Sequence, residues 1–165
     1  MRLVKADEPL DNIFDDRMSV FLGGGMTDWR AKTIEYLKDT EVTVVDPTWV
    51  DWDSSWTATM SNAHFRERVE WELEAQEICD MKVFCFEEST KAPVSMLELG
   101  LSTLFDATDW AKTTLVYCDE GFWKKGNIDI VCWKFGMQSV GSLEELMEEL
   151  KDQADKWYSA LQERT

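Results

Sequence analysis

The amino-acid sequence predicts an α/β fold with a mostly parallel sheet. Short runs rich in β-branched and aromatic residues alternate with longer segments of helical periodicity, which is typical of a parallel sheet with helices on both faces. A chain of 165 residues is long enough for one domain that buries roughly two thirds of its unfolded surface. Neither an internal repeat nor a low-complexity linker divides the chain. We therefore expect a single domain over 1–165, built on five strands.

The strands and helices can be placed in order along the chain. The strands are expected at 18–24, 41–46, 81–86, 113–118 and 137–141, of which the last has the weakest pattern. The helices between them are expected at 28–38, 62–79, 93–105 and 127–135. A last helix, 142–163, begins with Ser142 and Glu145 at the spacing of a capping box. The core of the domain should therefore span 18–141.

Composition and charge exclude several classes of function. The formal net charge of −16 argues against a nucleic-acid partner, because binding to a phosphate backbone depends on Lys and Arg. The sequence has no apolar run of membrane-spanning length, and its acidic N-terminus is unlike a signal or transit peptide. The four cysteines form no C-x-x-C pair, and a single histidine leaves a zinc site short of ligands. We expect a cytoplasmic protein that acts on a small molecule without a cofactor or metal and binds no membrane.

Three unusual segments follow the ends of predicted strands. They read "GGGMTDW", "DPTWVDWDSSW" and "EESTKAPVSMLELG", and ligands of open α/β sheets bind beyond the carboxyl ends of strands. The second lies in a loop, 46–60, that is longer than an ordinary connection, and its three tryptophans argue against disorder. The first resembles a dinucleotide fingerprint but has Asp28 where a third glycine is needed, so an NAD site is not expected. We expect its glycines to let a ligand approach the end of the first strand.

Glu72 lies on the apolar face of its predicted helix. On a helical wheel it falls about 20° from Phe65, within the apolar stripe, whereas the other glutamates of 62–79 gather on the far side. Its carboxylate should therefore point toward the sheet or toward a cavity at its edge. The alternative is a structural carboxylate paired with Arg66, Arg68 or a backbone group.

Glu98 lies between Leu97 and Leu99, and its position also allows two interpretations. Ser95 and Glu98 have the spacing of a capping box. Pro93 instead suits an earlier first turn, which would leave Glu98 one turn inside the helix among apolar neighbours. Desolvation there would raise its pKa and sharpen it as a nucleophile or acid. Two inward carboxylates at one edge of a sheet suggest glycosidic bond chemistry.

The segment "GNIDIVCWKFG" has two features of interest. The amide of Asn127 either caps a helix, the commoner role, or holds a hydroxyl group of a ligand. Trp133 and Phe135 add more apolar surface than one small sheet is expected to cover, and exposed patches of this kind usually mark interfaces. We therefore expect a homo-oligomer, at least a dimer.

Five segments together resemble the nucleoside 2-deoxyribosyltransferase-like family. They are "VFLGGG", "DPTWVDWDSSW", "FRERVEWELEAQEICDMKVFCF", "APVSMLELGL" and "GNIDIVC", in the family's order and spacing over about residues 18–136. The resemblance implies a flavodoxin-like sheet and a glutamate, Glu98 here, that attacks C1′ of a deoxynucleoside. Glu72 matches the acidic residue that helps hold and protonate the substrate. Asn127 matches an amide that the family lends across a subunit interface to the sugar.

The resemblance implies a site for a nucleoside or nucleobase, with the tryptophan loop stacking on the base. The expected substrate-binding residues are Phe21, Gly23, Gly24, Trp49, Asp51, Trp52, Asp53, Trp56 and Asn127. A second acid that the better-characterised transferases carry before the nucleophile's helix has no clear match, although Glu87 and Glu88 lie nearby. The expected activity is deoxyribosyl transfer between bases. The alternatives are hydrolysis of a nucleoside or nucleotide and, in another class, noncatalytic nucleotide sensing.

Overall fold

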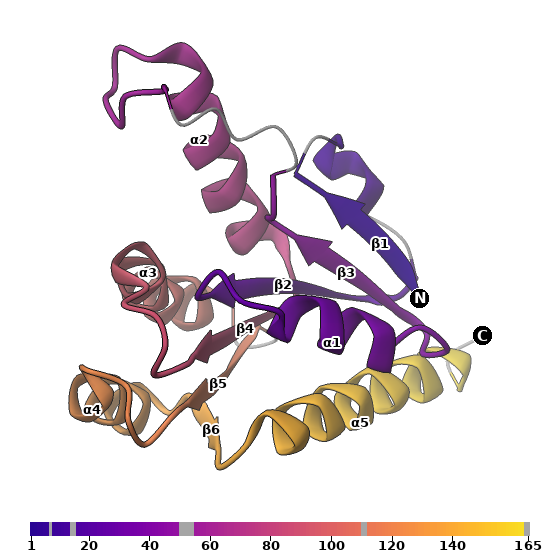
Figure 1. Cartoon of the computed structure of the whole chain (residues 1–165). Helices are drawn as coiled ribbons and strands as arrows, with labels where there is room; N and C mark the ends of the chain where they lie inside the picture. Colours follow the sequence, from indigo (N-terminus) through magenta and orange to yellow (C-terminus); the bar gives the residue numbers. More distant parts are fainter. Residues whose placement is uncertain (7, 14–15, 50–54, 110–111, 164–165) are drawn as a thin grey trace.

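A six-stranded parallel sheet forms the centre of the computed structural model (Figure 1), which describes residues 1–6, 8–13, 16–49, 55–109 and 112–163. The strands are β1 (Arg2–Lys5), β2 (Met18–Gly24), β3 (Val42–Asp46), β4 (Met81–Phe86), β5 (Thr113–Cys118) and β6 (Gln138–Val140). Their order in the sheet is β1-β3-β2-β4-β5-β6, and every neighbouring pair is parallel. The α/β fold with a parallel sheet is therefore confirmed.

The sheet has one strand more than the five expected. The additional strand, β1, pairs with β3 at the edge of the sheet, where Leu3 lies opposite Val44. It was missed because it has only four residues, of which Val4 alone is buried, so it shows no apolar run. The remaining strands lie in the order 2-1-3-4-5 when they are numbered without β1, which is the flavodoxin-like arrangement.

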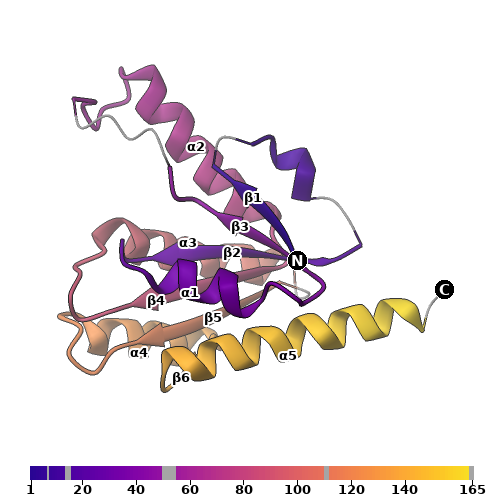
Figure 2. The same cartoon turned by 45° about the vertical axis from the view of Figure 1, so that its right-hand side comes forward.

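Five helices and one short 3-10 turn complete the fold. They are η1 (Leu10–Ile13), α1 (Trp29–Tyr36), α2 (Ala63–Ile78), α3 (Pro93–Thr108), α4 (Lys125–Phe135) and α5 (Leu143–Gln162). Helices α1 and α5 cover one face of the sheet, and α2, α3 and α4 lie on the other (Figures 1 and 2). The capping box of α5 is confirmed: Ser142 Oγ accepts a hydrogen bond from the Glu145 amide at 3.0 Å, and Glu145 Oε2 accepts one from the Gly141 amide at 2.7 Å.

The two central strands are buried on both faces. All residues of β2 and β4 are buried, as expected for parallel strands between two helical layers. Leu22 and Val83 pack beneath α1 and α5, whereas Phe84 and Phe86 pack beneath α3 and α4. None of the helices within the described ranges combines the length and apolar character that crossing a membrane requires.

The connections that leave β2 and β4 determine where a ligand can bind. These strands are neighbours, but α1 follows β2 on one face and α3 follows β4 on the other. The two loops therefore diverge at the carboxyl ends of the strands, and such a topological switch point is where open α/β sheets bind ligands.

Candidate active site

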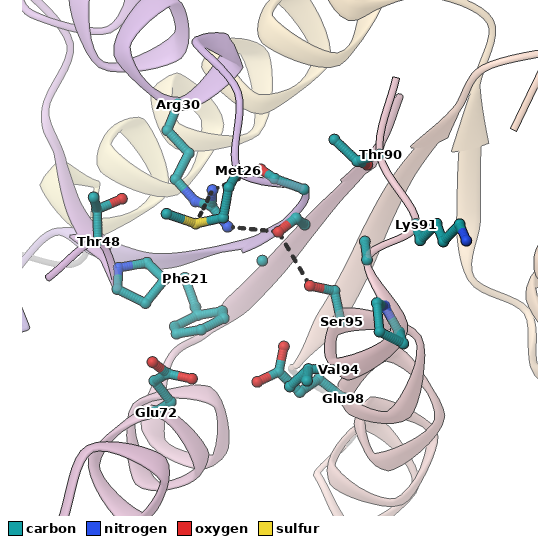
Figure 3. Close-up of a pocket in the computed structure, with 16 residues that line it drawn as sticks. Phe21, Met26, Arg30, Thr48, Glu72, Thr90, Lys91, Val94, Ser95 and Glu98 are labelled. Atoms are coloured by element: carbon teal, nitrogen blue, oxygen red, sulfur yellow. Dashed lines mark hydrogen bonds between the residues drawn. The ribbon is translucent and has the colours of Figure 1, made fainter. Parts of the chain in front are cut away.

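A cavity of about 450 Å³ opens at this switch point (Figure 3). Its walls come from the end of β2, from α1 and α2, from the start of the loop after β3, and from the loop after β4 that leads into α3. The described residues that line it are Phe21, Gly23, Gly24, Gly25, Met26, Arg30, Pro47, Thr48, Glu72, Thr90, Lys91, Ala92, Pro93, Val94, Ser95 and Glu98. Its volume lies within the range of small-molecule sites.

The floor of the cavity requires glycine. A Cβ atom on Gly23 would lie 2.5 Å from the ring of Phe84, and one on Gly24 would lie 2.3 Å from the carbonyl oxygen of Cys85. Gly24 also has a φ of +136°, a backbone conformation that residues other than glycine rarely adopt. The backbone can therefore serve as a wall of the cavity only because these positions lack side chains.

Arg30 and Ser95 hold this glycine turn from two sides. The buried guanidinium of Arg30 donates hydrogen bonds to the carbonyl oxygens of Leu22, Gly24 and Gly25, each at 2.9 Å. Ser95 Oγ donates to the Gly24 carbonyl oxygen at 3.1 Å, so α1 and α3 meet at one backbone group. Figure 3 shows Arg30 and the hydrogen bond of Ser95 beside the cavity.

Glu98 lies inside α3 and does not cap it. The helix begins at Pro93 after Ala92, whose left-handed φ of 38° turns the chain into the helix. Glu98 is therefore in the second turn, 7% exposed, and it lines the cavity. The capping-box alternative was wrong because Ser95, its expected N-cap, is already helical and bonds the Gly24 carbonyl instead.

Glu72 faces the same cavity from α2. The predicted inward position of Glu72 is confirmed, because it is half-buried at the cavity wall. The other glutamates of α2 are exposed: Glu67, Glu70, Glu74 and Glu77. Arg66, one candidate partner, lies 3.6 Å from Glu70 instead. In Figure 3 the carboxylates of Glu72 and Glu98 point toward one another from α2 and α3, beside the ring of Phe21.

The two carboxyl groups are electrostatically unequal. Burial and the nearby charge of Glu98 raise the pKa of Glu72 to about 7, although Trp49, Arg30 and Arg68 oppose the rise. Burial also raises the pKa of Glu98, while the carboxamide of Gln76 and the charge of Arg30 oppose that rise. With a pKa of about 7, the carboxyl group of Glu72 is partly protonated near neutral pH.

The tryptophans expected to cover the cavity pack against α2 instead. The guanidinium of Arg68 lies 4.2 Å from the ring centre of Trp49 and 4.0 Å from that of Trp56, and Trp56 stacks on His64 with 5.3 Å between ring centres. Neither Trp49 nor Trp56 lines the cavity. Trp49 still lies near Glu72, because its indole lowers the pKa of that carboxyl group. Its Nε1 atom, however, has no hydrogen-bond partner among the described residues. The predictions for Asp51, Trp52 and Asp53 lie outside the described residues.

Asn127 is exposed on α4 and lies away from the cavity of its own chain. Helix α4 begins at Lys125 with Lys124 as its N-cap residue, so the capping role considered for Asn127 was wrong. Of the remaining predicted residues, the structure brings Glu72, Glu98, Phe21, Gly23 and Gly24 together at one cavity.

Sequence reasoning missed the structural role of Arg30 and any role for Gln76. Arg30 is not among the predicted site residues, but its donors bind the glycine turn. The signal was present, because Arg30 shares a helix face with Thr33 and Leu37, which are both fully buried. Gln76 likewise lies one turn beyond Glu72 on the apolar side of α2.

Comparison with known proteins identifies the family of the chain. A family model described as nucleoside 2-deoxyribosyltransferase like matches residues 17–122, which is more than half of the chain. The chain belongs to this family. The match includes β2, the glycine turn and both helices that carry the facing glutamates.

A solved structure supports the fold of this family member. The crystal structure of a conserved protein from Enterococcus faecalis V583 aligns with 83% of this chain and 99% of its own, with a TM-score of 0.58 and 13% sequence identity. At this identity the likeness extends to the fold alone. No curated protein matches the chain.

Proposed function

We propose that this family member is a nucleoside 2-deoxyribosyltransferase, which cleaves the N-glycosidic bond of a deoxynucleoside and passes the sugar to a second base. The observation that carries the proposal is the pair of carboxyl groups, Glu72 and Glu98, that face one cavity from neighbouring helices. Glycosidic bond cleavage uses such a pair, one as the nucleophile and the other as the proton donor.

Glu98 is the nucleophile in this mechanism. A carboxylate oxygen of Glu98 forms a bond to C1′ as the bond between C1′ and the base nitrogen breaks, and the electron pair of that bond passes to the base. Glu72 donates its proton to the departing base. In the second half, a nitrogen of the acceptor base attacks C1′, Glu72 takes up the proton that this nitrogen releases, and the carboxylate of Glu98 leaves.

The surroundings of the two carboxyl groups support these roles. A proton donor must be protonated at the working pH, and burial together with the charge of Glu98 raises the pKa of Glu72 to about 7. A nucleophile must be ionised. Burial raises the pKa of Glu98 as well, but Gln76 and Arg30 oppose that rise, whereas the charge of Glu98 adds to the rise at Glu72. Such a difference between two like groups is a means of assigning acid and nucleophile.

The charges around the cavity favour a nucleoside over a nucleotide. Arg30 and Lys91 are the cationic residues among the described residues of its lining. Arg30 directs its donors at three backbone carbonyl groups. Lys91 is exposed near the start of α3. A 5′-phosphate would therefore find little of the basic surface that usually binds it.

The test is incubation with each deoxynucleoside, with and without a second free base, followed by chromatography. The expected result is a new deoxynucleoside that carries the second base. Release of free deoxyribose at the same rate with and without acceptor would show hydrolysis instead. No consumption of any deoxynucleoside or nucleotide would favour a noncatalytic sensing role.

A further inference from the structure

Gln76 is a buried polar side chain without a completed hydrogen bond. It lies in α2 one turn after Glu72 and is 0% exposed. Neither its Oε1 nor its Nε2 atom has a hydrogen-bond partner among the described residues. A buried carboxamide in this state lowers stability, and native proteins rarely retain one without a reason.

The position of Gln76 points to the candidate site. Residues four apart on a helix lie on one face, so Gln76 lies on the same face of α2 as Glu72, and α2 packs against α3. Its carboxamide lies close enough to Glu98 to lower the pKa of that carboxyl group. No completed hydrogen bond joins the two side chains, and catalytic hydrogen bonds often tighten only in the complex with substrate.

We propose that Gln76 is a positioning residue for Glu98: in the substrate complex its Nε2 donates a hydrogen bond to the Glu98 carboxylate and fixes the oxygen that attacks C1′. This role rests on the proposed function.

The other charged groups around Glu98 leave this role to Gln76. Glu72 on α2 disfavours a second negative charge in the cavity. Arg30 on α1 favours the ionised form of Glu98, but it also interacts with Asp46 and its donors are directed at backbone carbonyl oxygens. Among the described residues, Gln76 is therefore the neutral donor positioned to orient the Glu98 carboxylate.

The first experiment measures the titration of Glu98 in the free protein. Carboxyl resonances of 13C-glutamate-labelled protein are followed against pH, and the resonance missing from Glu98→Gln identifies Glu98. Gln76→Met keeps a similar volume and removes the amide. We expect it to raise the pKa of Glu98 by about one unit, the effect of one lost hydrogen bond to a carboxylate. Thr33→Val, which removes a buried hydroxyl from α1, is the matched control and should leave the pKa of Glu98 unchanged.

The second experiment measures the pH profile of turnover. In Gln76→Met the acidic limb of kcat/KM should move upward with the pKa of Glu98, and kcat should fall about tenfold while KM changes less than about twofold. Gln76→Asn, whose side chain is one methylene shorter, should also raise the pKa of Glu98. It replaces the Met variant in both experiments if that variant does not fold.

An unchanged Glu98 titration in folded Gln76 variants would overturn the proposal. So would a fall in turnover with an unmoved acidic limb, because a merely structural role predicts that result. If the wild-type protein turns over no deoxynucleoside, the proposed function fails, whereas the titration still decides whether Gln76 acts on Glu98.

Discussion

Glu72 and Glu98 are chemically identical side chains to which the fold gives different surroundings. Burial inside α3 raises the pKa of Glu98, while the Gln76 carboxamide and the Arg30 charge oppose that rise. Glu72 lies on α2 at the cavity wall, where burial and Glu98 favour its protonated form. The proposed chemistry depends on this difference, and two substitutions test the two residues separately.

Glu98→Gln should reduce turnover by about 10³-fold or more while the protein stays folded, because it removes the atom that forms the bond to C1′. Stopped assays by chromatography measure the loss, and circular dichroism checks the fold. Glu98→Ala should behave alike. Near-native turnover in the Gln variant would show that Glu98 is not the nucleophile.

Glu72→Gln should lower turnover and increase stability above neutral pH. The folded pKa of about 7 exceeds the ordinary value of 4.5, so between these values the folded state holds a proton that the unfolded chain has released. This contribution to stability is fully present below about pH 4.5 and is lost as the pH rises through 7. The Gln variant avoids that loss, so its advantage over the wild type should grow to roughly 1–3 kcal/mol by pH 8.

Urea unfolding of the wild type and of Glu72→Gln at pH 4, 6 and 8 measures this difference. The alkaline limb of the wild-type activity profile, expected near pH 7, should also disappear from the residual activity of the variant. A variant that loses much stability at every pH and keeps full specific activity would instead identify Glu72 as one half of a structural ion pair.

At the scale of elements, the end of β2 positions the site. Gly24 meets the backbone of the neighbouring strand β4 too closely for any side chain, and its carbonyl group joins Arg30 of α1 to Ser95 of α3. A change at this turn should therefore disturb both walls of the cavity.

Gly24→Ala should destabilise the protein by about 2–4 kcal/mol, because the added carbon meets the Cys85 carbonyl group and the backbone has a positive φ. Gly126→Ala is the matched control, since a Cβ atom there meets nothing within 4 Å. Thermal unfolding of both variants measures the contrast. Equal melting temperatures would show that the turn tolerates a side chain.

The sequence predicted the elements that have strong periodicity. The bounds of β2, β4 and β5 agree with the structure residue by residue, because continuous buried runs have clear ends. Strand β1 was missed because it has no such buried run. The separation of Trp49 and Trp56 from the cavity was also beyond prediction, because their packing against Arg68 depends on the path of a long loop. The facing of Glu72 and Glu98 across the cavity requires the relative placement of two helices, which periodicity does not supply.

At the scale of the whole molecule, α3 and α4 present an apolar surface. The exposed large apolar side chains on these two helices are Val94, Leu97, Leu104, Ile130, Trp133 and Phe135, and Trp133 is 82% exposed. The two acidic side chains of α3 add little charge to this surface, because Glu98 is buried and Asp106 pairs with Lys82. Helix α4 carries Lys125, Lys134 and Asp129, of which Lys125 and Asp129 pair at 3.1 Å. A chain of net charge −16 therefore has an apolar face with little net negative charge, suited to a second copy of itself.

We propose that the protein associates through this α3/α4 face. Trp133→Lys should weaken the association, whereas Met60→Lys, which adds the same charge at another exposed apolar residue, should not. Sedimentation velocity at micromolar concentration measures the assembly state. Added salt should tighten association, since it screens repulsion over a Debye length of about 8–10 Å. A fully active monomer at low and physiological salt would contradict both the assembly and a role for Asn127 in a neighbouring site.

The central claim is that Glu98 forms a covalent bond to the sugar. The most direct measurement is peptide mass spectrometry after incubation with a 2-fluoro-sugar nucleoside, whose fluorine slows release of the trapped sugar. We predict a fluorosugar adduct on the peptide that contains Glu98, located to that residue by fragmentation and absent from Glu98→Gln. Steady turnover of deoxynucleosides with no adduct on Glu98, or with the adduct on Glu72, would contradict the account.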